Sequence, residues 1–115
     1  MGDELVATNR DQDALKKLAQ KLGSTVTKKK LTIMVCDMSE EMITDAVQKA
    51  DEALDTMKLE VEMAKMIKKF FDSKYLPPWH IIVGRKFGSH VTHEVSTFAY
   101  FILGNMAFLI FRGIE

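Results

Sequence analysis

The chain has 115 residues, of which 47% are hydrophobic and 28% are charged, and its 16 basic and 16 acidic side chains leave no formal net charge. These values are ordinary for one globular domain and exclude a disordered chain, a collagen-like repeat and a disulfide scaffold. A neutral chain has no long-range attraction for nucleic acid or for an anionic membrane, so neither is expected as a partner.

The charges are distributed unevenly along the chain. Residues 1–30 carry seven basic and four acidic side chains, residues 31–74 carry six and ten, and residues 75–115 carry only three and two. A segment so poor in charge has to be buried, and a chain of this length has little other material with which to cover it. The last third of the sequence therefore predicts a partner subunit.

The cellular compartment is indicated by what the sequence lacks. Its single cysteine, Cys36, excludes an internal disulfide, and no set of Cys and His residues has zinc-finger spacing. The N-terminus lacks the basic flank and apolar core of a signal peptide, and the longest apolar run, residues 98–111, is too short to span a bilayer. We expect a cytoplasmic or cytoskeletal protein with no cofactor and no bound metal.

Residues 1–30 have the character of an N-terminal extension to a domain formed by residues 31–115. Leu15, Leu18 and Leu22 recur at helical spacing, and Gly23 follows them at a position typical of a helix end. The extension is either a short amphipathic helix that docks onto another surface or a solvated tail with local order only. Its basic run at the end has no aromatic neighbours, which favours a solvated linker over a nucleic-acid site.

The next elements are a strand and two helices. Residues 31–36 form a compact apolar, β-branched run that predicts a strand, and residues 37–41 then supply capping side chains and carboxylates suited to a helix start. Apolar residues keep helical spacing over residues 42–57 and again over residues 63–75, where two consecutive prolines end the second helix.

After the prolines, the period of the apolar residues changes from 3.6 to 2. Residues 79–83 and 87–93 predict strands, and residues 97–103 and 106–112 predict a hairpin whose Gly104-Asn105 loop suits a primed turn with positive φ. Both faces of this hairpin are apolar. One face can pack on the two helices, but the other needs a second sheet, which the chain itself does not supply.

The candidate sites for catalysis or metal binding are weak. His90 and His93 lie in a segment with a period of two, so their side chains would point to opposite faces, which argues against a metal site. Cys36 ends an apolar strand, where packing is favoured over a nucleophilic role. His80 is either a satisfied core histidine or, if its strand lies at a subunit interface, a pH-sensitive element of a dimer. A small enzyme using His93 and Glu94 is the alternative from another functional class.

Several motifs together resemble one known family. They are Asp37-Met38-Ser39-Glu40-Glu41-Met42, Ile67-Lys68-Lys69, the block from Trp79 to Glu94, and Phe98, Tyr100 and Gly104 with the apolar run that follows. These motifs resemble the eight-kilodalton dynein light chain family, a class unrelated to the roadblock and Tctex light chains. The resemblance covers residues 35–112 and leaves out the first 30, so we expect a divergent paralogue with an N-terminal extension.

The resemblance implies an α+β fold in which two helices pack on an antiparallel sheet. Two protomers would exchange the strand at residues 87–92 and dimerise through their sheets, forming a β-sandwich flanked by helices. Each of two parallel grooves would then offer an unpaired strand edge to a linear client segment. The implied function is a non-catalytic dynein light chain that binds dynein intermediate chain or other disordered clients and promotes their dimerisation in a microtubule motor. A general dimerisation hub for non-dynein clients is the alternative.

The resemblance also implies the residues of the client groove and of the dimer interface. Glu60 matches a carboxylate that meets the central glutamine of a TQT-like client motif, and His80 matches a histidine whose protonation favours monomers. The implied groove consists of Glu60, Lys86, Phe87, Gly88, Ser89, His90, Val91, Thr92, His93, Phe98, Tyr100, Ala107 and Leu109. The implied dimer interface consists of His80, Lys69, Phe87, Ser89, His90 and Thr92.

The sequence departs from the family pattern at four places. His90 replaces an interface tyrosine, Ile102 a groove tyrosine and Val61 a lysine, while residues 112–114 replace a C-terminal Lys-Ser-Gly. Each lost polar contact would cost ~1 kcal/mol, or up to tenfold in affinity. We therefore expect a specialised homodimer, or a heterodimer with another light chain, dedicated to a dynein intermediate chain of the cytoplasm or of a ciliary or flagellar axoneme.

Overall fold

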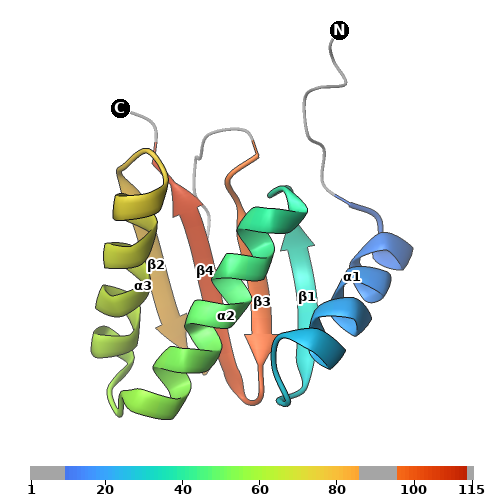
Figure 1. The fold of residues 1–115 in the computed structure, drawn as a ribbon, viewed down its shortest axis with the longest axis horizontal. Coiled ribbons are helices and arrows are strands. Elements are labelled where there is room, and N and C mark those ends of the chain that lie inside the picture. Colours follow the sequence, from blue (N-terminus) through green and yellow to red (C-terminus); the bar gives the residue numbers. More distant parts are fainter. Residues whose placement is uncertain (1–9, 86–95, 114–115) are drawn as a thin grey trace, which may run out of the picture.

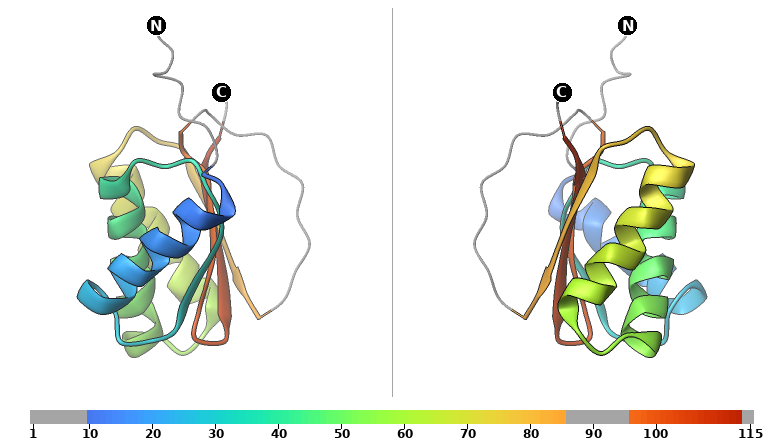
Figure 2. Two further views of the ribbon diagram at one scale, coloured as in Figure 1. Left: turned by 90° about the vertical axis from the view of Figure 1, so that its right-hand side faces the viewer. Right: turned by 90° about the vertical axis from the view of Figure 1, so that its left-hand side faces the viewer.

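The computed structural model describes residues 10–85 and 96–113, which form three helices packed on one side of a four-stranded antiparallel sheet (Figures 1 and 2). This arrangement confirms the predicted α+β class. In chain order the elements are α1 (Gln12–Thr25), β1 (Leu31–Cys36), α2 (Glu40–Thr56), α3 (Glu60–Lys74), β2 (Trp79–Gly84), β3 (Ala99–Leu103) and β4 (Met106–Arg112).

The strands are ordered β1-β3-β4-β2, so the β3–β4 hairpin forms the centre of the sheet and β1 and β2 are its edges. The hairpin turns at Gly104, whose φ is 66°, while Ser96 is the only non-glycine among the described residues with a positive φ. Asn105 therefore has a negative φ. Positive φ at the first central position alone is the pattern of a type II′ turn, which matches the twist of the flanking strands.

The core lies between the helices and the sheet. Helices α2 and α3 each turn one apolar stripe toward the strands, as expected for amphipathic helices. The helical contribution is Ile43, Ala46, Val47, Ala50, Ala53, Met63, Ile67 and Phe71, and the strands contribute Ile33, Cys36, Trp79, Ala99, Phe101, Leu103, Met106, Phe108 and Ile110.

Helix α2 begins two residues before the predicted apolar run. The Ser39 hydroxyl accepts a hydrogen bond from the backbone N–H of Met42 (3.2 Å), so Ser39 is the N-cap. Glu40 and Glu41 then lie in the first turn, where the helix dipole favours negative charge.

Helix α1 continues to Thr25, so the prediction that a helix ends at Gly23 is wrong. The backbone N–H of Val26 donates to the Leu22 carbonyl (2.8 Å), and the hydroxyls of Ser24 and Thr25 donate to the Lys21 carbonyl (3.1 and 2.8 Å). The bond from Val26 satisfies a carbonyl group that the last turn would otherwise leave unpaired.

Helix α1 belongs to the same core as the rest of the described chain. Leu15, Leu18 and Leu22 are buried, and the helix lies along β1 at the edge of the sheet (Figure 1). At its start, Arg10 donates one backbone and three side-chain hydrogen bonds to Cys36 and Met38. Considering only the described residues, none of the helices has the length and apolar character required to span a bilayer.

Candidate functional site

The sheet face turned away from the helices is the candidate interaction surface, and we call it the open face. Side chains alternate between the two faces of a strand, so the residues out of phase with the core lie here. No helix or strand of the described chain covers this face (Figure 2). Its members are Thr32, Val35, His80, Ile82, Tyr100, Ile102, Ala107, Leu109 and Phe111.

The open face is apolar at its centre and becomes more exposed toward the edge strand β2. Leu109 is fully buried, Tyr100 and Ile102 are half-buried, and Ile82 is 41% exposed. Apolar side chains thus come from neighbouring strands to form a continuous surface. Ala107, Leu109 and Phe111 are already buried within the single chain, so the apolar area left exposed on this face lies mainly at Ile82 and the half-buried Ile102.

His80 is exposed on the open face, so the prediction of a core histidine is wrong. Adjacent residues of a strand point to opposite faces. Trp79 points into the core, where its ring lies 4.8 Å from that of Phe71, and His80 must therefore point the other way. The His80 ring lies 5.3 Å from that of Phe111. A role of His80 in a subunit interface stays a prediction.

The start of β2, next to His80, is held by a charged pair on α3. Asp72 accepts a hydrogen bond from the Trp79 N–H (2.9 Å) and pairs with Lys68 (2.9 Å), which also donates to the Trp79 carbonyl (2.6 Å). Partial burial by itself raises the pKa of Asp72, but the bonds from Lys68 and from the Trp79 N–H outweigh it and lower that pKa below its ordinary value. The carboxylate therefore keeps its charge at neutral pH.

The start of β3 is held by Asp37, which is only 6% exposed. Its two carboxylate oxygens accept hydrogen bonds from the backbone N–H groups of Phe98 (2.7 Å) and Ser96 (3.2 Å), and its own N–H donates to the Phe98 carbonyl (3.0 Å). The sequence indicated only a helix-capping role for Asp37. No local pattern reveals its partners, because they lie 59 and 61 residues away.

The structure brings four of the predicted groove residues together on or beside the open face. Tyr100 and Leu109 are directly paired across β3 and β4, and Ala107 lies opposite Ile102. Phe98 precedes β3, with its ring 6.4 Å from that of Phe111.

Two other predicted site residues lie in the helix layer. Glu60 is the first residue of α3 and is exposed, and Lys69 is exposed on the same helix. One protomer therefore does not place them on the open face. The rest of the predicted site lies outside the described residues: the groove edge Lys86, Phe87, Gly88, Ser89, His90, Val91, Thr92 and His93, together with the strand predicted at residues 87–93 and the enzyme candidate Glu94.

The described residues offer an apolar surface and no assembled catalytic set. Cys36 is fully buried, and this desolvation raises the pKa of its thiol, which disfavours the nucleophilic thiolate. No group of three or more His, Cys, Asp or Glu side chains in the described ranges could hold a metal ion. The two cavities beside α1 are lined by no histidine or cysteine of that part of the chain.

Comparisons with known proteins agree on one family. Residues 30–113 match the family model described as dynein light chain type 1. A dynein light chain of Schistosoma mansoni is 52% identical over 88 residues, covering 76% of this chain and 99% of that protein.

Two solved structures share the fold. Both are of the dynein light chain-like domain of the Fasciola hepatica calcium binding protein FhCaBP2, one native and one a mercury derivative. Each superposes with a TM-score of 0.63 at 20% identity, and they cover 75% and 74% of this chain and 93% of theirs.

Proposed function

Because the chain belongs to the dynein light chain family, we propose that it is a non-catalytic adaptor that dimerises through its open face and holds two linear client segments as added β-strands. One observation carries this proposal: neighbouring strands contribute apolar side chains to a face that no described helix or strand covers. Burial of apolar surface is worth about 25 cal/mol per Å², so a second sheet on this face would stabilise a dimer. Two sheets packed face to face would give a β-sandwich with the helices outside.

The client groove, in this proposal, forms next to the edge strand β2. Among the described strands, β2 pairs with β4 alone, which leaves its other edge available for the exchanged strand at residues 87–92 of a second copy. That strand would in turn present an unpaired edge to the client. Main-chain hydrogen bonds would then supply affinity, and pockets for alternate side chains would supply selectivity.

Side chains on both layers are available to such a client. Phe98, Tyr100, Ala107 and Leu109 would form the floor of the groove. Glu60 begins α3 at the end of the molecule where β2 also ends, so its exposed carboxylate is available to a glutamine of the client (Figure 1).

The departures from the family pattern favour a specialised client over a general hub. Val61 is 63% exposed beside Glu60, and Ile102 is half-buried on the open face. Neither side chain can donate a hydrogen bond to a TQT-like segment. We propose that the client is a dynein intermediate chain whose contacts with these positions are apolar.

The proposed mechanism is bivalency. Two parallel grooves on one dimer would capture two copies of a disordered chain, because binding in the first groove raises the effective concentration at the second to about millimolar. The dimer would thereby align its clients in parallel. Such a role suits the cytoskeletal motor complex to which the family belongs, in the cytoplasm or in an axoneme.

The dimer is tested by placing a charge on the open face. Ile82→Arg puts a guanidinium on an exposed open-face position, and we expect sedimentation equilibrium to show a monomer with an unchanged circular dichroism spectrum. The matched control is Leu76→Arg, since Leu76 is 69% exposed in the loop before β2 and is not part of a strand of the sheet. A dimer of equal affinity in both variants would contradict the proposal.

The client preference is tested by fluorescence anisotropy with a labelled peptide that carries a TQT core. We expect Val61→Lys to raise the affinity by up to tenfold, because an ammonium group returns beside Glu60. Peptide binding that is unaffected both by this change and by Ile82→Arg would place the client outside the proposed groove.

A further inference from the structure

Helix α1 lies along the outer edge of β1 without closing it. A cavity of about 380 Å³ remains between the two elements, near the lower end of the range for ligand pockets. Because β1 and β2 are opposite edges of the sheet, this cavity, which we call the α1–β1 groove, is distinct from the client groove proposed beside β2. Its lining in the described chain is Gln12, Leu15, Lys16, Ala19, Gln20, Leu31, Thr32, Ile33 and Met34.

The backbone of β1 presents unpaired peptide groups to this groove. The Lys30 carbonyl accepts a hydrogen bond from the Gly104 N–H (2.8 Å), so in the antiparallel ladder the peptide groups of Thr32 point toward β3. Those of Leu31 and Ile33, one residue out of phase, point away from β3. No hydrogen bond from the described residues reaches them. An extended peptide could therefore pair with both residues.

The side chains around these peptide groups are apolar, with one charge at the rim. Apolar contacts are supplied by Leu15, Ala19, Ile33 and Met34. Met34 is 47% exposed, and the flexible methionine side chain adapts readily to different ligands. Lys16 is the only charged residue among the described lining. Its ammonium forms no ion pair within the described chain, and no acidic residue is among the described lining of the groove.

The groove is held open by bonds at both ends of α1. At the start, the Arg10 guanidinium donates to the carbonyls of Met38 (2.7 Å) and Cys36 (3.3 Å). Along the helix, Lys21 pairs with Glu40 of α2.

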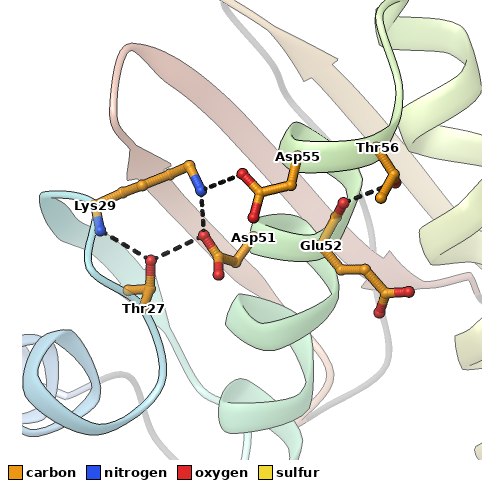
Figure 3. Close-up of polar contacts among 6 residues, drawn as sticks. All are labelled: Thr27, Lys29, Asp51, Glu52, Asp55 and Thr56. Atoms are coloured by element: carbon orange, nitrogen blue, oxygen red, sulfur yellow. Dashed lines mark hydrogen bonds and ion pairs between the residues drawn. The ribbon is translucent and has the colours of Figure 1, made fainter.

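After the helix, a second polar cluster ties the chain to α2 (Figure 3). Thr27 donates to Asp51 (3.0 Å), and Lys29 pairs with Asp51 (2.5 Å) and with Asp55 (2.8 Å). With three leucines of α1 in the core as well, the helix has little freedom to collapse onto β1. A preformed groove binds without a large ordering cost.

We propose that the α1–β1 groove is a second peptide-binding site, which takes an extended apolar segment flanked by acidic residues. The segment adds as a strand beside β1, with its main chain paired to Leu31 and Ile33. Its apolar side chains contact Leu15 and Ala19, and a carboxylate meets Lys16. The charge of the groove selects acidic over basic segments of the same apolar content.

The site is tested on the full chain with two acetylated octapeptides, each with four central Val residues, which are flanked on both sides by two Glu residues in one peptide and by two Lys residues in the other. Amide exchange measured by NMR should show slower exchange of the Leu31 and Ile33 N–H groups with the Glu peptide and no change with the Lys peptide. Exchange of these two amides that is unchanged by the Glu peptide would overturn the proposal.

Variants locate the binding. Lys16→Glu should weaken binding of the Glu peptide about fivefold to tenfold, because it reverses a rim charge. Lys17→Glu is the matched control, since Lys17 is also exposed on the same helix but does not line the groove, and it should change affinity less than twofold. Ala19→Trp should abolish binding by filling the groove. Equal effects of the two lysine variants, or wild-type affinity in Ala19→Trp, would overturn the proposal.

Two further measurements separate binding in the α1–β1 groove from two alternatives: a β1 edge that is already covered, and binding in the client groove beside β2. If the Leu31 and Ile33 amides are already protected without peptide, the edge is covered by the chain itself or by a second copy, and the proposal fails. The Ile82→Arg variant should still bind the Glu peptide, and a TQT-core peptide should leave the two amides unprotected. The dimer proposal and the groove proposal can therefore fail independently.

Discussion

Asp37 offers the sharpest test of how β3 is positioned, because one buried carboxylate accepts two backbone N–H groups from a distant segment. Asp37→Ala removes both acceptors and leaves the N–H groups of Ser96 and Phe98 without their partner. Asp37→Asn keeps one oxygen for Phe98 but turns an NH₂ group toward the Ser96 N–H.

The expected magnitudes follow from these contacts. A hydrogen bond to a charged group contributes about 1.5–3 kcal/mol, and an orphaned buried donor costs about 1–3 kcal/mol. The hydrogen bond from the Phe98 N–H (2.7 Å) is shorter than the one from the Ser96 N–H (3.2 Å), so the Ser96 bond contributes less to the free energy of unfolding. We expect Asp37→Ala to lower the free energy of unfolding by about 2–4 kcal/mol and Asp37→Asn by about 1–2 kcal/mol.

Urea unfolding at one fixed protein concentration measures these changes, because the stability of a dimer depends on concentration. Asp13→Ala is the control: it removes an exposed carboxylate from the first turn of α1 and should cost at most about 1 kcal/mol. A loss below about 1 kcal/mol for Asp37→Ala would refute the argument that its two bonds anchor β3.

Three other predictions address α1, the dimer and the cysteine. Leu22 is 2% exposed, so Leu22→Ala should lower the unfolding free energy by about 2–4 kcal/mol in one transition; no effect on urea unfolding would mean that α1 does not share the core. His80→Asp places a charge on the open face and should weaken the dimer in sedimentation equilibrium; an unchanged dimer affinity would refute a role of His80 in the interface. Cys36 should react with a thiol reagent at pH 8 only on unfolding. Fast labelling of the native protein would contradict this expectation. Because burial raises the pKa of the Cys36 thiol, the stability that the protonated thiol contributes is complete below its ordinary pKa of 9.0. That stability is lost as the pH rises through the pKa of the folded state.

Local signals were enough to predict most elements of the fold. The strands at Leu31–Cys36 and Met106–Arg112 have the predicted bounds, because charged or turn residues limit each apolar run. The Gly104 turn followed from a local requirement for positive φ. The end predicted for α1 at Gly23 was wrong, because the helix continues until the Val26 N–H caps the Leu22 carbonyl and Val26 packs against the core.

The assignment of the groove residues stays a prediction. Phe98, Tyr100, Ala107 and Leu109 were assigned through a family resemblance, and the strand register places Tyr100 opposite Leu109, with Ala107 on the same face. His80 was left open between the core and an interface, because the sequence does not say which face of β2 the helices cover. The burial of Trp79 decides this in the structure.

The scarcity of charge in the last third of the chain indicated, by sequence alone, that a large apolar surface would need covering. The periodicity determined which residues share a face, since the spacing of side chains in a helix or a strand is a local property. Only the tertiary structure decided which elements meet: the strand order β1-β3-β4-β2, the helices on one side of the sheet, and the contact of Asp37 with Phe98. Likewise, the leucines of α1 predicted an apolar stripe, but only the packed chain placed that stripe along β1 and left a groove beside it. The physical reason is that hydrophobic attraction has no direction, so an apolar stripe specifies burial without specifying its partner.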